Sequence, residues 1–566
     1  MKKRIPIGID NFEDIITEGY YYVDKTLLIK ELLDLTGEVN LFARPRRFGK
    51  TLNLSMLQAF FENTGDERKN QKKRELFTNL QIMKAGEAYT RHMARYPVIF
   101  LTLKSAKQRT LQSALFKMKE CISQEYRRHE YVCDDMKLSD SEKQLFRKLA
   151  DNEGTIDEYS GSLQFLSQCL YKVTGEKVII LLDEYDTPMQ EAYLYGYWKE
   201  FTAFIRSLFN ATFKTNPYLE RAMMTGITRV SKESVFSDLN NLNVVTTTST
   251  EYETCFGFSE EEVFQALEER GMNNQKKLVK SWYDGFVFGN THDIYNPWSI
   301  TNFLDKKQVR PYWADTSSNS MIDELIRKAS TDIKEKMEEL LQGKEIVVNF
   351  DEQIVFEQLD QDENAIWSLM LVSGYLKAEQ IEYRGVLLEP WYHLRITNLE
   401  TTAMFTTMFK GWFAKNQSNY NQFMKALLSD DIDAMNYYMN QIIMTTFSYF
   451  DVGQNEPERF YHGFVLGLIA DQTDIYEIRS NRESGFGRYD VMMIPKIKET
   501  KKYPAIIMEF KVRNIKREES LEDTVQTALT QIKEKCYDAE LYDRGLKKEE
   551  IHHYGFAFEG KKVLIG

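Results

Sequence analysis

Short apolar runs alternate with helix-like stretches over the N-terminal part of the chain. The apolar runs include VNLFA (39–43), PVIFLTL (97–103) and VIILLD (178–183), and LNLSMLQAFF (52–61) is a helix-like stretch between two of them. Continuous apolar runs of strand length that alternate with helices are typical of a parallel sheet with helices on both faces. We therefore predict an α/β domain over residues 1–250.

The pattern over residues 251–452 is mostly helical, with turns rich in tryptophan and tyrosine. The clearest helix start is in GFSEEEVFQALEER, where Ser259 and Glu262 have the spacing of a capping box. Phe258 and Val263 flank that start with the spacing of a hydrophobic staple. We interpret residues 251–452 as a helical lid and connector.

The order of elements changes again near the C-terminus, where residues 453–566 form a segment of ordinary domain size. The patterns predict an α-β-β-β-α-β unit, with a helix at 458–471, strands at 473–480, 487–495 and 503–512, a helix at 521–542 and a last strand at 552–560. The whole chain thus reads as three domains. Its 566 residues agree with this, because single cores rarely grow beyond about 250 to 300 residues.

Composition narrows the classes of protein to consider. The formal net charge of −12 argues against a broadly basic nucleic-acid coat, although it leaves room for a local basic channel. The five cysteines are scattered and form no C-x-x-C pair, which argues against a disulfide framework or a zinc site. No apolar run approaches the roughly 20 residues of a membrane span, and MKKRIPIGID lacks the apolar core of a signal peptide. We expect a cytoplasmic protein without a membrane partner.

The segment RPRRFGKT, Arg44 to Thr51, follows a strand-like run and precedes a helix-like one. That arrangement suits a nucleotide phosphate, because loop N–H groups and the helix N-terminus point at the anion. Gly49 would let the backbone approach closely, Lys50 would reach the β- and γ-phosphates, and Thr51 would ligate Mg²⁺. The first glycine of the general P-loop pattern is replaced by Arg44, so an ordinary loop-to-helix turn is the alternative.

A second motif supports nucleotide binding. The run VIILLDEYD ends a buried strand in Asp183 and Glu184, at the sheet edge where open α/β folds bind ligands. Asp183 would hold Mg²⁺ and Glu184 would polarise the attacking water. Together with the P-loop this indicates binding of ATP or GTP. Thr225 and Arg229, in a third strand-loop run, would either sense the γ-phosphate or cap the next helix.

The arginines of the P-loop segment are further candidates. Arg44, Arg46 and Arg47 would neutralise nucleotide phosphates or bind a partner, and the alternative is that they are solvated surface arginines.

Three residues of the C-terminal segment have the spacing of a metal-dependent nuclease site. Asp490 lies in GRYDVMMI, and Glu509 and Lys511 lie in IIMEFKV. Residues two apart on a strand share a face, so Glu509 and Lys511 project together and Phe510 projects to the opposite face. If the two strands pair, Asp490 joins Glu509 in a carboxylate pair that suits Mg²⁺, and Lys511 can orient or deprotonate the attacking water. The alternative is a half-buried Glu509–Lys511 surface pair on an edge strand. Gln531 lies on the following helix.

These motifs resemble a known family. The segments LFARPRRFGKTLNLSML, LLDEYDTP, TGITRVSKESVFSDLNNL and FGFSEEEV resemble the AAA-ATPase-like domain of a family of bacterial proteins. The segments YHGFVLGL, ESGFGRYDVMMI and IIMEFKV resemble the PD-(D/E)XK nuclease-superfamily domain in the C-terminal half of that family. The family's own RPRRFGK segment also has arginine at the position of Arg44.

The resemblance implies a restriction-endonuclease-like fold at residues 453–566 and a P-loop NTPase-like parallel sheet at residues 1–250. It places the superfamily's metal-binding acids at Asp490 and Glu509, its lysine at Lys511 and its helix glutamine at Gln531.

We therefore expect an ATP-binding, Mg²⁺-dependent nuclease that acts on nucleic acid, DNA or RNA. Two alternatives remain: a non-cleaving nucleotide-dependent switch that binds nucleic acid or a protein partner, and an assembly scaffold with neither centre active. A homo-oligomer is compatible with the sequence, which does not define the oligomeric state.

Overall fold

The computed structural model describes residues 3–228, 236, 239–314, 320–341, 343–352, 362–412, 417–446, 475–484, 487–496, 503–514, 517–560 and 562–566. The chain divides into two compact units, the first formed by residues 1–319 with 343–402 and the second by residues 320–342 with 403–566. The segment 251–452, which we interpreted as a connector, contributes residues to both units. The boundaries of the three predicted domains stay a prediction.

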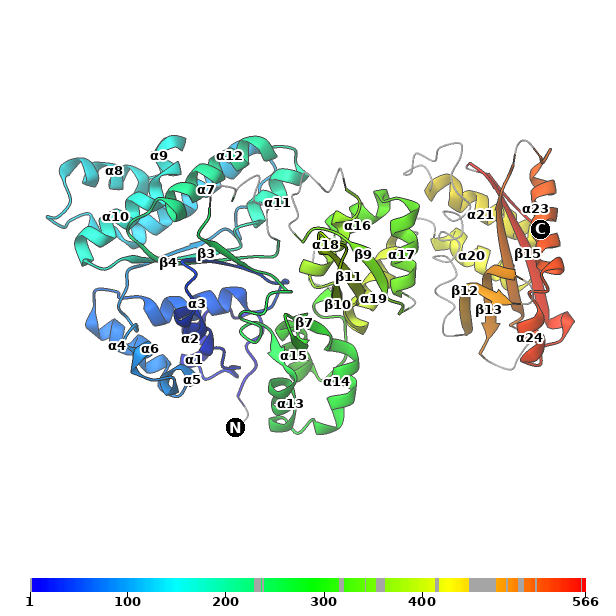
Figure 1. Ribbon diagram of the computed structural model, residues 1–566, viewed down its shortest axis with the longest axis horizontal. Helices are drawn as coiled ribbons and strands as arrows, with labels where there is room; N and C mark the ends of the chain where they lie inside the picture. Colours follow the sequence, from blue (N-terminus) through cyan, green and yellow to red (C-terminus); the bar gives the residue numbers. More distant parts are fainter. Residues whose placement is uncertain are drawn as a thin grey trace. The chain divides into compact units, whose positions relative to one another are not determined.

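A five-stranded parallel sheet organises the N-terminal part of the first unit (Figure 1), in the order β2-β3-β4-β1-β5. Its strands are β1 (Val39–Ala43), β2 (Val98–Thr102), β3 (Val178–Asp183), β4 (Leu219–Gly226) and β5 (Leu242–Val245). The strands β1 and β3 are buried along their whole length, which explains their unbroken apolar runs. The predicted parallel sheet is confirmed.

Helices lie on both sides of this sheet, with α1 to α6 on one side and α7 to α12 on the other (Figure 1). The first group is α1 (Phe12–Thr17), α2 (Leu27–Asp34), α3 (Lys50–Phe61), α4 (Glu67–Leu76), α5 (Gln81–Lys84) and α6 (Glu87–Thr90). The second group is α7 (Leu111–Arg128), α8 (Asp140–Ala150), α9 (Ile156–Ser160), α10 (Ser162–Thr174), α11 (Thr187–Leu194) and α12 (Trp198–Phe209).

The rest of the first unit contains helices and two small antiparallel sheets that the sequence analysis did not predict. The strands are β6 (Phe258–Ser259), β7 (Phe286–Phe288) and β8 (Thr291–Tyr295) in one sheet, and β9 (Ile346–Asn349), β10 (Leu376–Arg384) and β11 (Glu389–Ile396) in the other. The helices are α13 (Glu260–Glu269), α14 (Lys276–Tyr283), α15 (Pro297–Lys306) and α18 (Ala365–Val372). The predicted capping box is confirmed, because the side chains of Ser259 and Glu262 each accept the other's backbone N–H.

The second unit is built on a mixed five-stranded sheet in the order β12-β13-β14-β15-β16. Its strands are β12 (Tyr476–Ser484), β13 (Gly487–Pro495), β14 (Ala505–Val512), β15 (Ile551–Glu559) and β16 (Lys562–Ile565). Strands β14 and β15 run parallel, and the other neighbours are antiparallel. The helices of this unit are α16 (Ser320–Lys328), α17 (Thr331–Leu341), α20 (Gln417–Leu428), α21 (Ile432–Thr446), α23 (Leu521–Glu534) and α24 (Ala539–Asp543). The chain passes into the second unit after residue 319, returns to the first after residue 342, and passes into the second again within α19 (Leu399–Trp412).

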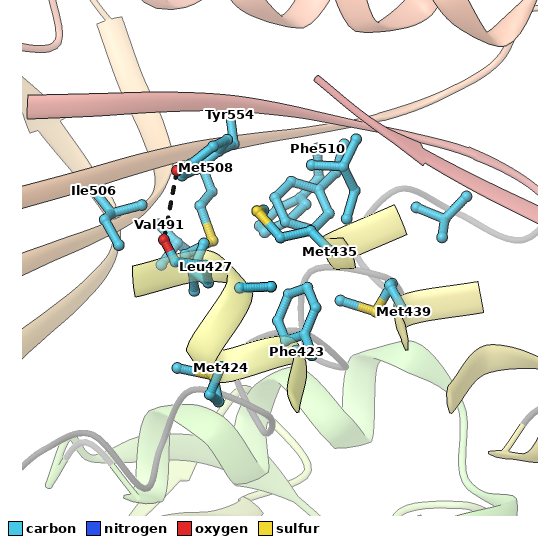
Figure 2. Close-up of a cluster of buried hydrophobic side chains, with 14 of the residues drawn as sticks. Phe423, Met424, Leu427, Met435, Met439, Val491, Ile506, Met508, Phe510 and Tyr554 are labelled. Atoms are coloured by element: carbon cyan, nitrogen blue, oxygen red, sulfur yellow. Dashed lines mark hydrogen bonds between the residues drawn. The ribbon is translucent and has the colours of Figure 1, made fainter. Parts of the chain in front are cut away.

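Alternate residues of β14 enter two separate apolar cores. Ile506, Met508 and Phe510 pack with side chains of α20 and α21, as Figure 2 shows for part of that cluster. Ala505 and Ile507 pack on the opposite face with residues of α23 and α24. The sheet is therefore covered by helices on both faces, and the alternation determines which side chains of β14 face which helix.

Two details of the C-terminal prediction are wrong. The helix predicted at 521–542 is two helices, α23 and α24, because Cys536 between them has a φ of 53° and cannot continue the right-handed helix. A further strand, β16, follows the strand that we expected to be the last. The helix predicted at 458–471 lies outside the described residues.

Among the described helices, none combines the length and the apolar character that crossing a bilayer requires.

Phe423 on α20 is a test of the packing between α20 and the sheet. Its side chain is fully buried in the cluster that contains Phe510, so Phe423→Ala should lower the free energy of unfolding of the second unit by about 3 to 5 kcal/mol. Tyr437→Ala on α21 is the control, because the Tyr437 side chain is mostly exposed. Urea denaturation followed by near-ultraviolet circular dichroism measures both, and equal midpoints for the two variants would contradict this packing.

Candidate functional site

Lys50, the first residue of α3, closes the loop between β1 and α3. Gly49 precedes α3 with a φ of 79°, a left-handed conformation that glycine adopts without strain. The buried Lys50 Nζ donates hydrogen bonds to the carbonyl oxygens of Arg44 (2.7 Å) and Pro45 (2.8 Å). Burial lowers the pKa of Lys50 to about 8, although nearby carboxylates oppose the shift. The same ammonium can bind an anionic phosphate in exchange for these two carbonyls.

Asp183, at the end of β3, has a fully buried side chain between two threonines. Thr51 Oγ1 donates to Asp183 Oδ2 (2.9 Å), and Thr225 Oγ1 donates to Asp183 Oδ1 (2.6 Å). The strand order explains why these three side chains are in contact, because β4 lies between β1 and β3 and brings Thr225 to the same edge of the sheet. The structure therefore places Thr51 and Asp183, the predicted Mg²⁺ ligands of this half, in direct contact.

The turn after β3 is held by the backbone of Glu184 and the side chain of Asp186. Glu184 has a φ of 52°, and its backbone N–H donates to Thr225 Oγ1 (3.3 Å). Asp186, which the sequence analysis did not select, is buried and accepts hydrogen bonds from the backbone N–H groups of Ile227 and Thr228 (both 2.9 Å). Its position as the third acid in LLDEYD was the available signal. Asp186 thus ties the turn after β3 to the turn after β4.

The arginines that the sequence analysis selected for phosphate binding lie in environments different from that of Lys50. Arg44 is fully buried, donates from Nη1 to the Val245 carbonyl (3.3 Å), and lies over the rings of Phe256 (5.6 Å) and Phe288 (4.6 Å). Burial lowers its pKa to about 10. Its guanidinium therefore fastens the loop to β5 and to the segment that contains β7.

Arg47 is exposed and lies over the ring of Trp298, 4.4 Å from the centroid. Arg229 lies outside the described residues. Phosphate binding by Arg44, Arg47 and Arg229 stays a prediction.

In the second unit, β13 and β14 place two carboxylates side by side. Val491 pairs with Met508, so the next position along the ladder sets Asp490 opposite Glu509. Both acids follow the alternation that faces α23, and Phe510 faces the other core. Asp490 Oδ2 also accepts the backbone N–H of Phe510 (2.8 Å), which holds the carboxylate against β14.

Lys511 and Gln531 converge on Glu509. Lys511 Nζ donates to Glu509 Oε1 (3.0 Å), and Gln531 Nε2 on α23 donates to the same oxygen. Gln531 Nε2 also donates to the hydroxyl of Tyr537 (3.1 Å), a buried residue that the sequence analysis missed. Tyr537 lies just beyond α23, and no local motif marks it. The four predicted residues of this half are thus brought together, with Tyr537 fixing the glutamine.

The electrostatics of this cluster favour an added cation. Burial, and then the neighbouring Asp490, raise the pKa of Glu509 to about 7. Burial also raises the pKa of Asp490, against the opposing effects of the Phe510 N–H and Lys511. Glu509 Oε2 is buried and, among the described residues, has no hydrogen-bond donor. A buried carboxylate oxygen without a hydrogen-bond donor, beside a second carboxylate, fits a divalent cation of the Mg²⁺ type.

Two family models match separate parts of the chain. The family model "Predicted AAA-ATPase" matches residues 6–236, and the model "PD-(D/E)XK nuclease superfamily" matches residues 456–566. A protein of Azotobacter chroococcum mcd 1, described as "Uncharacterized protein in vnfD 5'region", is 26% identical over 574 residues, which cover 98% of this chain and 96% of that protein. The matched ranges contain the P-loop segment and the Asp490–Glu509 pair respectively.

The free energy of unfolding of the Thr225→Val variant tests the hydrogen bond between Thr225 and Asp183. The isosteric change removes the hydroxyl that donates to the buried Asp183 carboxylate, so the free energy of unfolding of the first unit should fall by about 1 to 3 kcal/mol. Thr102→Val is the control, since Thr102 is exposed on β2. Denaturant midpoints that are equal for the two variants would show that the Thr225 bond does not hold Asp183.

Proposed function

We propose that this chain, which carries a predicted AAA-ATPase-like domain and a PD-(D/E)XK nuclease superfamily domain, is an ATP-binding, Mg²⁺-dependent nuclease. The observation that supports cleavage most directly is the convergence of Lys511 and Gln531 on Glu509, beside Asp490. A structural ion pair on an edge strand does not account for it, because β14 is an interior strand and Glu509 is only 1% exposed.

Each residue of the cluster has a role that follows from its contacts. Asp490 and Glu509 would hold the cation, which supplies positive charge to a phosphate undergoing in-line displacement. The Phe510 N–H keeps Asp490 in place, and Gln531 fixes one oxygen of Glu509 so that the other faces the site. Lys511 is 19% exposed, so its ammonium would orient a water beside Glu509, and its neutral amine, after loss of a proton, would accept a proton from that water.

The N-terminal site is proposed to bind ATP through Lys50, with Thr51 and Asp183 holding Mg²⁺ and Glu184 orienting water. The direct Thr51–Asp183 contact supports that assignment. We further propose that nucleotide state regulates the nuclease. Arg44 fastens the P-loop segment to β7 within the first unit, and the chain passes between the two units after residue 319, after residue 342 and within α19. The five free cysteines fit the cytoplasmic location that we propose.

One observation favours a second candidate function. The net charge of −12 weakens non-specific attraction to nucleic acid, which favours a non-cleaving nucleotide-dependent switch that binds nucleic acid or a protein partner. Cleavage assays separate the two.

Asp490→Asn should reduce cleavage about 100-fold or more, because it removes the charge of one metal ligand without changing shape. The assay uses single- and double-stranded DNA and RNA with Mg²⁺, with and without ATP. Asp543→Asn is the matched control, since Asp543 is an exposed acid of the same unit. Cleavage that Asp490→Asn leaves unchanged, or wild-type protein that cuts none of the four substrates, would refute the nuclease proposal.

Lys50→Ala should weaken ATP binding at least about tenfold, because the ammonium beside the P-loop carbonyls is lost. Isothermal titration calorimetry with ATP measures the change. Lys30→Ala, on the exposed surface of α2, is the control. Equal affinity in the wild type and Lys50→Ala would mean that ATP does not bind at this loop.

A further inference from the structure

Lys104 lies next to the nucleotide site, and no motif in the sequence marks it. It follows β2, and the backbone N–H of Leu103 donates to the Asp183 carbonyl (3.0 Å), which keeps this segment beside the end of β3. Lys104 Nζ lies 3.8 Å from Asp183 Oδ2 and donates to Asp10 Oδ2 (2.8 Å). The ammonium is therefore shared between a carboxylate of the site and one outside it.

The two carboxylates differ in environment. The Asp183 side chain is 0% exposed, and the side chains of Lys104 and Asp10 are 37% and 62% exposed. A buried carboxylate requires a compensating charge. Within the described ranges, Lys104 is the one cationic side chain with a nitrogen within 4.0 Å of the Asp183 carboxylate. The oxygen that it approaches, Oδ2, is also the one that accepts from Thr51.

We propose that Lys104 is an exchangeable counter-ion of the nucleotide site. Its ammonium balances Asp183 while no divalent cation is bound, and it moves away from Asp183 and keeps only its contact with Asp10 when Mg²⁺ is held by Thr51 and Asp183. The closer contact with the exposed Asp10 gives the ammonium a place to remain after the exchange. When nucleotide binds without Mg²⁺, Lys104 stays at Asp183 and reduces its repulsion of the phosphates. This inference rests on the proposed nucleotide binding.

The charge exchange predicts two effects of opposite sign for Lys104→Met. Without its competitor, Mg²⁺ should support half-maximal ATP binding at a concentration about fivefold lower than in the wild type. In EDTA, by contrast, ATP affinity should fall by about fivefold, because Asp183 then faces the phosphates without the Lys104 ammonium. Calorimetric titrations with ATP across a series of Mg²⁺ concentrations measure both. Lys104→Arg should behave like the wild type, and so should Lys107→Met, which removes an exposed lysine of the same loop.

The outcomes are distinguishable. Unchanged Mg²⁺ dependence in Lys104→Met, with ATP still bound, overturns the role of Lys104 and leaves the nucleotide site intact. An equal shift in Lys104→Arg also overturns it, because the effect would then not depend on charge. Wild-type protein that binds no ATP at any Mg²⁺ concentration overturns both this inference and the nucleotide part of the proposed function.

Discussion

A carboxylate buried in a sheet has to be compensated, and both candidate sites are organised by this constraint. Asp183 has two threonine hydroxyls on its oxygens and a lysine nearby. Glu509 has a lysine and a glutamine on one oxygen, and a buried second oxygen without a donor among the described residues. The free-energy cost of leaving such groups unpaired is large. Each site therefore brings together polar side chains from separate elements that lie far apart in the sequence.

Local patterns in the sequence were enough to predict the residues on which these sites are built. Gly49 and Lys50 mark a loop that leads into a helix, and the apolar run before Asp183 marks a buried strand, so neither inference needed information about distant residues. The two-residue period of a strand likewise predicted that Phe510 and Glu509 face opposite sides of the sheet. The packing of Phe510 against Phe556, with ring centroids 5.1 Å apart, fixes that register, because a shift of one residue would place Glu509 in the apolar core.

The features that the sequence did not reveal depend on contacts between distant segments. The burial of Arg44 follows from carbonyl groups at the end of β5 and from the rings of Phe256 and Phe288. Tyr537 has a role only because the chain turns at Cys536 and brings its hydroxyl back to Gln531. The helical pattern of the sequence continues through this turn. The left-handed residue is a cysteine and not a glycine, so the sequence contains no signal that predicts the turn. The strands β6 to β9 have only two to five residues, and the pairing of β10 with β11 is interrupted between Ala378 and Gln380, which weakens any periodic signal.

The two lysines beside the buried acids differ in a way that matters for function. Lys511 donates to Glu509 at 3.0 Å and is 19% exposed, whereas Lys104 lies 3.8 Å from Asp183, is 37% exposed and has a second carboxylate to bind. Coulomb attraction weakens with distance and with solvent, so Lys104 is held less firmly by its buried acid than Lys511 is by Glu509. In the proposed nuclease, Lys511 is therefore suited to remain beside Glu509 and act on a bound water. Lys104 is suited to leave, which makes its position dependent on the charge bound beside Asp183.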